Sequence, residues 1–123
     1  MSAYIDTRLG IPIRADYVND FFRGLVNEFF KILPMWENRE ETLPVYLQSL
    51  QVELLGFQEL VLSFKPSSRN VAKPGYDYVS LLAILQRFID APDLRTDQVR
   101  REVFKAISIC NRICSCVSEE VVS

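Results

Sequence analysis

The chain has 123 residues, of which 49% are hydrophobic and 24% charged, and its net charge is -2. This composition is typical of a globular domain and excludes a disordered chain. The charge balance by itself favours neither nucleic acid nor an anionic membrane as a partner. The longest strictly apolar runs, such as residues 81–85, fall far short of the roughly 20 residues that a membrane-spanning helix needs. The N-terminus lacks the basic stretch and apolar block of a secretory signal, so we expect a single cytoplasmic domain.

Residues 1–14 form the first predicted segment, and they lack helical periodicity. Gly10 and Pro12 interrupt any regular element, and a residue before proline favours extended geometry. The segment is nevertheless strongly apolar for a tail. We therefore expect an extended apolar N-terminal arm that docks either on its own domain or on a neighbouring subunit, and the sequence leaves both arrangements open. Its apolar residues are Tyr4, Ile5, Leu9, Ile11 and Ile13.

A helix is predicted over residues 16–33, where apolar residues recur as adjacent pairs every four positions. At 100° per residue, such pairs cover more than half of the helix circumference, which is wide enough to contact two neighbouring helices. Pro34 is expected to end this helix, and the connector 34–42 contains Trp36. The pairs are Tyr17 and Val18, Phe21 and Phe22, Leu25 and Val26, and Phe29 and Phe30.

Residues 43–64 carry an apolar repeat with spacings of four and three, which predicts a helix that packs through one narrow stripe. Thr42 is suited to cap this helix, and Lys65 with Pro66 should stop it. A loop is expected over 65–76, because that stretch contains two prolines and a glycine. The repeat consists of Leu43, Leu47, Leu50, Leu54, Phe57, Val61 and Phe64.

Two further helices are predicted, over residues 77–90 and 97–117. The first is apolar on most sides, which predicts a central helix or one in an oligomer interface. The second repeats the four-and-three spacing through Val99, Val103, Ala106, Cys110 and Ile113, and Thr96 is placed to cap it. With short connections, sequential helices become neighbours. The predicted fold is therefore an all-α, antiparallel four-helix bundle with the N-terminal arm attached.

The cysteines Cys110, Cys114 and Cys116 lie within seven residues. An odd, clustered set is a poor disulfide framework. A zinc site normally needs four ligands, and the chain has no histidine to supply one. We interpret Cys110 and Cys114 as small buried residues of the apolar stripe. The alternative is a redox or intermolecular thiol role for Cys116. No metal or cofactor is expected.

The sequence carries no recognised catalytic motif. Without histidine, the chain cannot form a Ser-His-Asp or Cys-His arrangement. Its glycines are scattered and form no phosphate-binding loop. The acidic pair Asp16 and Asp20 lies at the start of a predicted helix, where the helix dipole favours negative charge. The sequence therefore predicts a protein that is not an enzyme.

One face of the last predicted helix carries Arg101, Lys105 and Arg112, with Arg100 near the start of the helix, and this basic stripe could track phosphate groups. The loop residues Lys65, Arg69 and Lys73 could add to this surface if they fold onto the same side. An ordinary solvated helix face explains the pattern equally simply. We therefore keep a nucleic-acid-binding accessory protein as an alternative function. The helical residues of this candidate surface are Arg100, Arg101, Lys105 and Arg112.

Apolar residues exceed what four helices with one buried stripe each would cover. Large exposed apolar patches usually mark association surfaces, and symmetric self-association is the simplest way to bury them. We expect a non-enzymatic, self-associating helical interaction protein, a homo-oligomer that binds a protein partner. A small inhibitor or accessory factor encoded by a phage or mobile element is a further alternative. The candidate interface residues are Tyr4, Ile11, Ile13, Phe22, Phe30, Trp36, Phe104 and Ile109.

Overall fold

The computed structural model describes residues 4–5, 7–64 and 74–122, with the backbone alone for Pro74 and for 116–122. The described residues form four helices: α1 (Ala15–Glu37), α2 (Leu43–Leu62), α3 (Pro74–Asp90) and α4 (Thr96–Val122). Two short strands, β1 (Tyr4–Ile5) and β2 (Ile13–Arg14), precede them.

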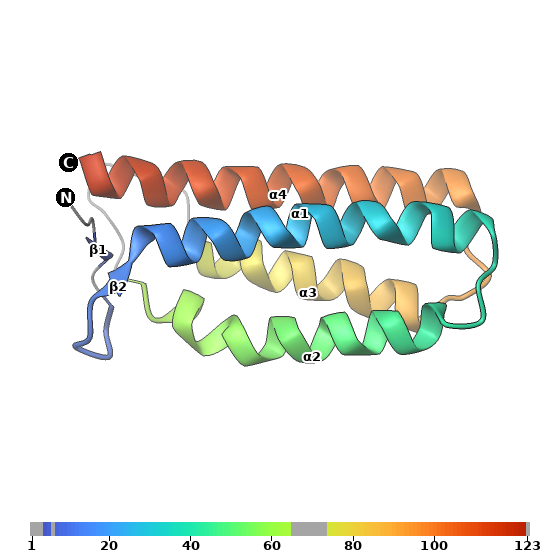
Figure 1. The fold of residues 1–123 in the computed structure, drawn as a ribbon, viewed down its shortest axis with the longest axis horizontal. Helices are drawn as coiled ribbons and strands as arrows, with labels where there is room; N and C mark the ends of the chain where they lie inside the picture. The colour runs from blue at the N-terminus through green and yellow to red at the C-terminus, as the bar shows by residue number, and fades with distance from the viewer. Residues whose placement is uncertain (1–3, 6, 65–73, 123) are drawn as a thin grey trace.

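The four helices run alternately in opposite directions along one long axis (Figure 1). α1 packs most extensively on α4 and α2 on α3, while α3 also packs on α4 and α1 more loosely on α2. The predicted all-α, antiparallel four-helix bundle is therefore confirmed. The two connections at one end of the bundle, α1 to α2 and α3 to α4, lie near each other (Figure 1).

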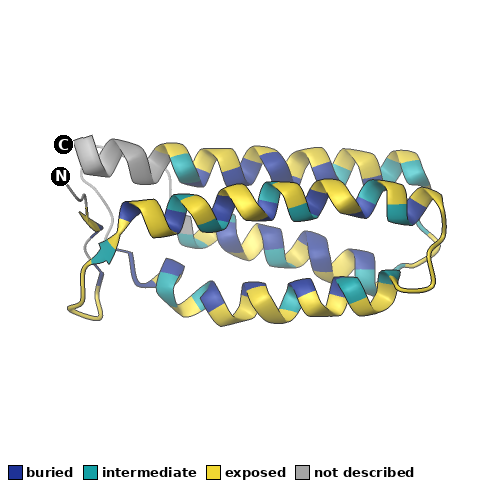
Figure 2. Cartoon of the chain, in the orientation of Figure 1, coloured by how far each residue is buried: buried dark blue, intermediate teal, exposed yellow. Residues whose placement is uncertain are grey.

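The core forms from the predicted apolar repeats. On α2, Leu47, Leu50, Leu54, Phe57 and Val61 are buried. Phe64, two residues after the end of the helix, is also buried, and Leu43 is half-buried. Buried and exposed positions alternate along each helix, as a narrow packed stripe requires (Figure 2). On α4, the buried members of the repeat are Val99, Val103, Ala106, Cys110 and Ile113.

Aromatic rings connect α1 with α2 and α3, and they make use of the wide apolar arc predicted for α1. The ring of Phe21 stacks on Phe57 with centroids 3.8 Å apart. Phe22 meets Tyr78 edge to face at 5.9 Å. The edge-to-face arrangement of Phe22 and Tyr78 is one of the favourable geometries for aromatic pairs. The first half of α1 thus contacts two neighbouring helices at once.

The N-terminal arm docks on its own chain, which settles the question that the sequence left open. β1 and β2 pair antiparallel, with Ile5 opposite Ile13. The side chain of Ile5 is buried, and β1 packs on α4. The backbone N–H of Arg8 donates to the carbonyl of Ser63 at 2.6 Å, next to a bridge between Thr7 and Phe64. The strands were not expected, because two-residue segments are too short to show alternation.

Pro34 does not end α1, so the predicted boundary is wrong. The helix continues to Glu37, and the backbone N–H of Asn38 donates to the carbonyl of Pro34. The last turn is held by Trp36, whose ring packs 5.7 Å from that of Phe88. Proline removes one hydrogen bond of the helix, and the burial of the tryptophan compensates for this loss.

The other helix boundaries shift by a few residues. α2 ends at Leu62, two residues earlier than expected, because Phe64 pairs with the arm. α3 begins at Pro74, and proline is tolerated in the first turn of a helix. Thr42 precedes α2 as expected, but its side chain makes no capping hydrogen bond.

The start of α4 also differs from the prediction, since Thr96 is inside the helix rather than its cap. The backbone N–H of Arg95 donates to the side-chain oxygen of Gln98 at 3.1 Å. This is the contact by which the third helical residue reaches back in a capping box.

Candidate interaction surfaces

Phe22, Trp36 and Ile109 were predicted to lie in an interface, and this placement is wrong. All three are buried in the core of the single chain. The indole N–H of Trp36 donates to the backbone carbonyl of Leu94 at 2.9 Å, which fixes the α3–α4 connection on the end of α1. These residues stabilise the fold and do not form an exposed apolar patch.

The other candidate interface residues remain accessible to different degrees. Tyr4, Ile11, Phe30 and Phe104 are exposed, and Ile13 is half-buried. Phe30 on α1 and Phe104 on α4 meet edge to face with centroids 6.0 Å apart. Their side chains are 42% and 50% exposed, so the two rings form one accessible aromatic patch across α1 and α4. We call Phe30 and Phe104 the aromatic pair.

A second apolar surface, on α2, was missed by the sequence reasoning. Val45, Val52, Leu55 and Leu62 are 66%, 69%, 50% and 45% exposed. Successive positions are separated by seven, three and seven residues, so the four side chains share one face of the helix. The buried residues of α2 lie on the opposite face.

Two polar residues complete this face. Gln48 and Glu59 fall between the apolar positions, and both are exposed. We call these six residues, 45, 48, 52, 55, 59 and 62, the outer row of α2. They form a second repeat with spacings of three and four beside the one that builds the core. That second repeat is the signal in the sequence that could have revealed the surface.

Small residues border the outer row on one side. Ser49 and Gly56 are separated by seven residues and are both exposed. A Cβ atom on Gly56 would meet no atom of the chain within 4 Å. The fold of the single chain therefore does not require glycine at this position. A glycine here leaves room for another backbone to come close to α2.

The predicted basic surface on α4 is partly neutralised by acidic neighbours. Arg112 makes a bidentate contact with Asp77 on α3, with both N–O distances 2.9 Å. Arg100 pairs with Glu37 on α1 at 3.1 Å. Arg101 and Lys105 are exposed and make no ion pair within the described part of the chain. The loop residues Lys65, Arg69 and Lys73 lie outside the described residues.

The cysteines differ in burial. Cys110 is buried and Cys114 half-buried, so the prediction holds fully for the first and partly for the second. Burial raises the pKa of Cys110 to about 12, and Cys114 is shifted in the same direction, also mainly by burial. Both thiols therefore stay protonated at neutral pH, a form that is neither a good nucleophile nor a metal ligand. The side chain of Cys116 is outside the described residues.

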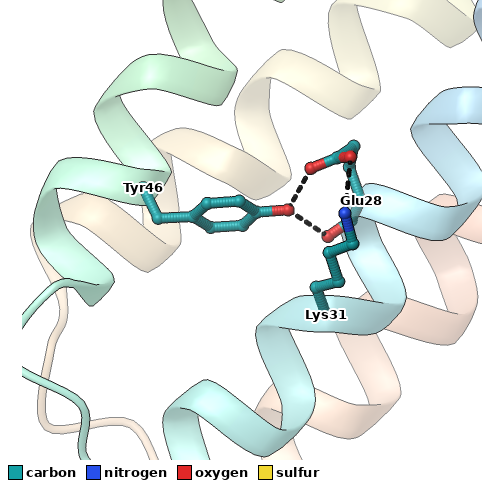
Figure 3. A network of polar contacts seen from close by, with 3 residues as sticks. All are labelled: Glu28, Lys31 and Tyr46. Carbon is teal, nitrogen blue, oxygen red and sulfur yellow. Dashed lines mark hydrogen bonds and ion pairs between the residues drawn. The ribbon is translucent and has the colours of Figure 1, made fainter.

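A polar network ties α2 to α1 (Figure 3). The hydroxyl of Tyr46 donates to the carboxylate of Glu28, and Lys31 donates to the same carboxylate at 3.0 Å. The hydrogen bond from Tyr46 is the main cause that lowers the pKa of Glu28. Burial is the largest cause that raises the pKa of Tyr46, and the hydrogen bond with Glu28 is the second. The pKa of Glu28 lies below neutral pH and that of Tyr46 lies above it. The pair therefore suits a structural link rather than proton transfer.

An open depression of about 530 Å³ lies where the two connections meet at one end of the bundle. Trp36, Leu43 and Leu94 form its apolar part, and Arg39, Glu40 and Arg95 border it with mixed charge. Across the described residues, no group of three or more Cys, Asp or Glu side chains is arranged to hold a metal ion.

Comparison with protein-family models, with curated proteins and with solved structures gave no significant match. Within the described residues, no helix combines the length and the apolar character needed to cross a membrane.

Proposed function

We propose that this chain is a non-enzymatic, self-associating helical interaction protein that acts in the cytoplasm and binds a protein partner. The observation that carries the proposal is the outer row of α2, where four aliphatic side chains are each at least 45% exposed. Single exposed apolar residues are common, but four that share one face of a helix are typical of an association surface.

The aromatic pair supports the proposed binding of a protein partner. Phe30 and Phe104 lie on α1 and α4, whereas the outer row lies on α2. Aromatic residues are enriched in protein interfaces. Two separate apolar surfaces would allow one to bind a second copy while the other binds a different protein.

Light scattering across a concentration series tests the self-association. We expect a mass that rises from 14.2 kDa toward at least twice that value as the concentration increases. A mass that stays at the value of the single chain up to the highest concentration would overturn the proposal of self-association.

Affinity capture with matched variants tests the partner. Phe104→Ala removes half of the aromatic pair, and Lys105→Ala, at the next exposed position of α4, serves as the control. We expect a protein that the parent and Lys105→Ala retain and that Phe104→Ala loses. Equal retention by both variants would remove the aromatic pair from the proposal.

The nucleic-acid alternative has less support, because Arg100 and Arg112 are engaged by acidic side chains. It is tested by Arg101→Glu combined with Lys105→Glu, which leaves the Arg112–Asp77 contact intact. We expect little binding of a labelled oligonucleotide by the parent at about 0.15 M salt, where exposed charges are screened beyond about 8 Å. Submicromolar, salt-sensitive binding that the double variant loses would favour this alternative instead. A factor encoded by a phage or mobile element stays a prediction.

A further inference from the structure

We propose that the outer row of α2 pairs with the same row of a second copy of the chain, in antiparallel orientation, and this pairing rests on the self-association proposed above. The two-fold axis would pass α2 midway between Glu53 and Leu54. In such a symmetric interface, the same patch serves both subunits, and it must therefore be complementary to itself.

The outer row has the order that this symmetry needs. Its six positions are separated by three, four, three, four and three residues, so the spacing reads the same from either end. In the antiparallel arrangement, Val45 meets Leu62 of the second copy and Val52 meets Leu55 of the second copy. Each apolar layer then places a valine against a leucine, and all four of these side chains are exposed in the single chain. Regular spacings of three and four allow the side chains of one helix to fill the gaps of the other.

The polar members of the row determine the orientation. In the antiparallel arrangement, Gln48 meets Glu59 of the second copy, and symmetry makes this contact twice. The amide N–H groups of glutamine can donate to the carboxylate, which satisfies both residues. A parallel arrangement would instead place Glu59 against Glu59 of the second copy, and like charges facing each other are unfavourable. The charge pattern therefore selects the antiparallel pairing.

The flanks of the row favour a second copy of α2 over an unrelated helix. In the same arrangement, Ser49 lies across from Gly56 of the second copy, so small residues face each other along one side. The Cβ position of Gly56 is open in the single chain. α2 contains no lysine or arginine, and its acidic residues are Glu53 and Glu59. Glu59 therefore meets no basic residue in a second copy of α2. The uncharged Gln48 lies opposite it and is the polar match that the chain itself provides.

The size of the contact predicts a weak dimer. α2 has 20 residues and is therefore about 30 Å long. A contact along a single helix of this length buries less than the roughly 1,200 Å² at which standard stable interfaces begin. We therefore expect a dissociation constant in the micromolar range and exchange between monomer and dimer.

Sedimentation equilibrium on three variants of the full chain tests the pairing. Leu55→Glu adds a carboxylate near the axis and should leave a monomer with an unchanged circular dichroism spectrum, because Leu55 is half exposed. Gln48→Lys places a cation against Glu59 of the second copy twice, and should tighten the dimer roughly fivefold. Glu41→Gln makes the same change of net charge outside the outer row, and should leave the dissociation constant unchanged.

The outcomes separate this inference from the function on which it rests. A parent that stays monomeric at all concentrations overturns both, and any occupant of the outer row is then a different protein. A parent dimer that Leu55→Glu does not weaken overturns the pairing through α2 but retains self-association. A dimer that Leu55→Glu abolishes and Gln48→Lys weakens overturns the antiparallel orientation, because the parallel arrangement would bring the two new lysines together.

Discussion

Leu54 and Leu55 are adjacent in the sequence but lie on opposite sides of α2. The side chain of Leu54 is 0% exposed and packed in the core, whereas that of Leu55 is 50% exposed in the outer row. The same residue type at neighbouring positions therefore has two different roles, one in the fold and one on the surface.

This relationship predicts that alanine at the two positions has very different effects on stability. Leu54→Ala leaves a cavity in the core and should lower the free energy of unfolding by about 2–5 kcal/mol. Leu55→Ala should change it by less than about 0.5 kcal/mol, as is usual for exposed positions. Urea denaturation at a concentration where the chain is monomeric measures both values. Equal losses from the two variants would contradict the burial pattern of α2.

The hydrogen bond from Tyr46 to Glu28 predicts an acid-dependent contribution to stability. Because this contact lowers the pKa of Glu28 from 4.5, the folded state gains stability above pH 4.5 and loses the gain as the pH falls through the lowered pKa. Tyr46→Phe should therefore lower the free energy of unfolding at pH 7 by about 1–2 kcal/mol. The difference from the parent should shrink below pH 4, as measured by urea denaturation across this pH range. A difference that is the same at both pH values would exclude the role of the Glu28 charge.

The helices could be predicted from the sequence because each buries a stripe that recurs with the helical period. The boundaries were less accurate where tertiary contacts decide them. Pro34 is a strong local stop signal, and the burial of Trp36 beyond it overrides that signal. Phe64 continues the apolar repeat of α2, yet it lies beyond the helix and pairs with the arm.

The surfaces were harder to predict than the fold. In α1, the sequence shows Phe29 and Phe30 as equivalent neighbours, yet in the folded bundle Phe29 is buried and Phe30 is exposed. On α2, one apolar repeat is enough to predict the helix, so the second repeat, which includes Val52 and Leu55, adds nothing to that prediction. Local spacing identifies a stripe, but the three-dimensional arrangement determines which stripe is covered.

The raised pKa of Cys110 predicts a loss of stability in alkaline solution. Burial raises this pKa from 9.0 to about 12, so the protonated thiol favours the folded state below pH 9 and this advantage disappears as the pH rises toward 12. Cys110→Ala should lower stability at pH 7, because it removes buried volume. The free energy of unfolding should then fall less steeply between pH 9 and 11 in the variant than in the parent. Burial also raises the pKa values of Tyr78, Tyr46 and Cys114, and these groups contribute to the decrease that remains. Parallel pH profiles for both proteins would contradict the assignment to Cys110.

The end of α1 predicts a stabilising substitution. The backbone N–H of Arg39 donates to the carbonyl of Trp36, and that of Glu40 donates to the carbonyl of Met35. These two bonds form the Schellman motif, which places Arg39 in the left-handed region with φ 49°. A side chain is strained there and glycine is not, so Arg39→Gly should raise the free energy of unfolding by up to about 1 kcal/mol. Asn38→Gly is the matched control: Asn38 has φ -85°, so glycine there should only lower stability by increasing the freedom of the unfolded chain. Thermal unfolding of the two variants measures the difference. A lower midpoint for Arg39→Gly than for the parent would contradict the prediction, because the arginine side chain would then stabilise the end of the bundle by more than the strain costs.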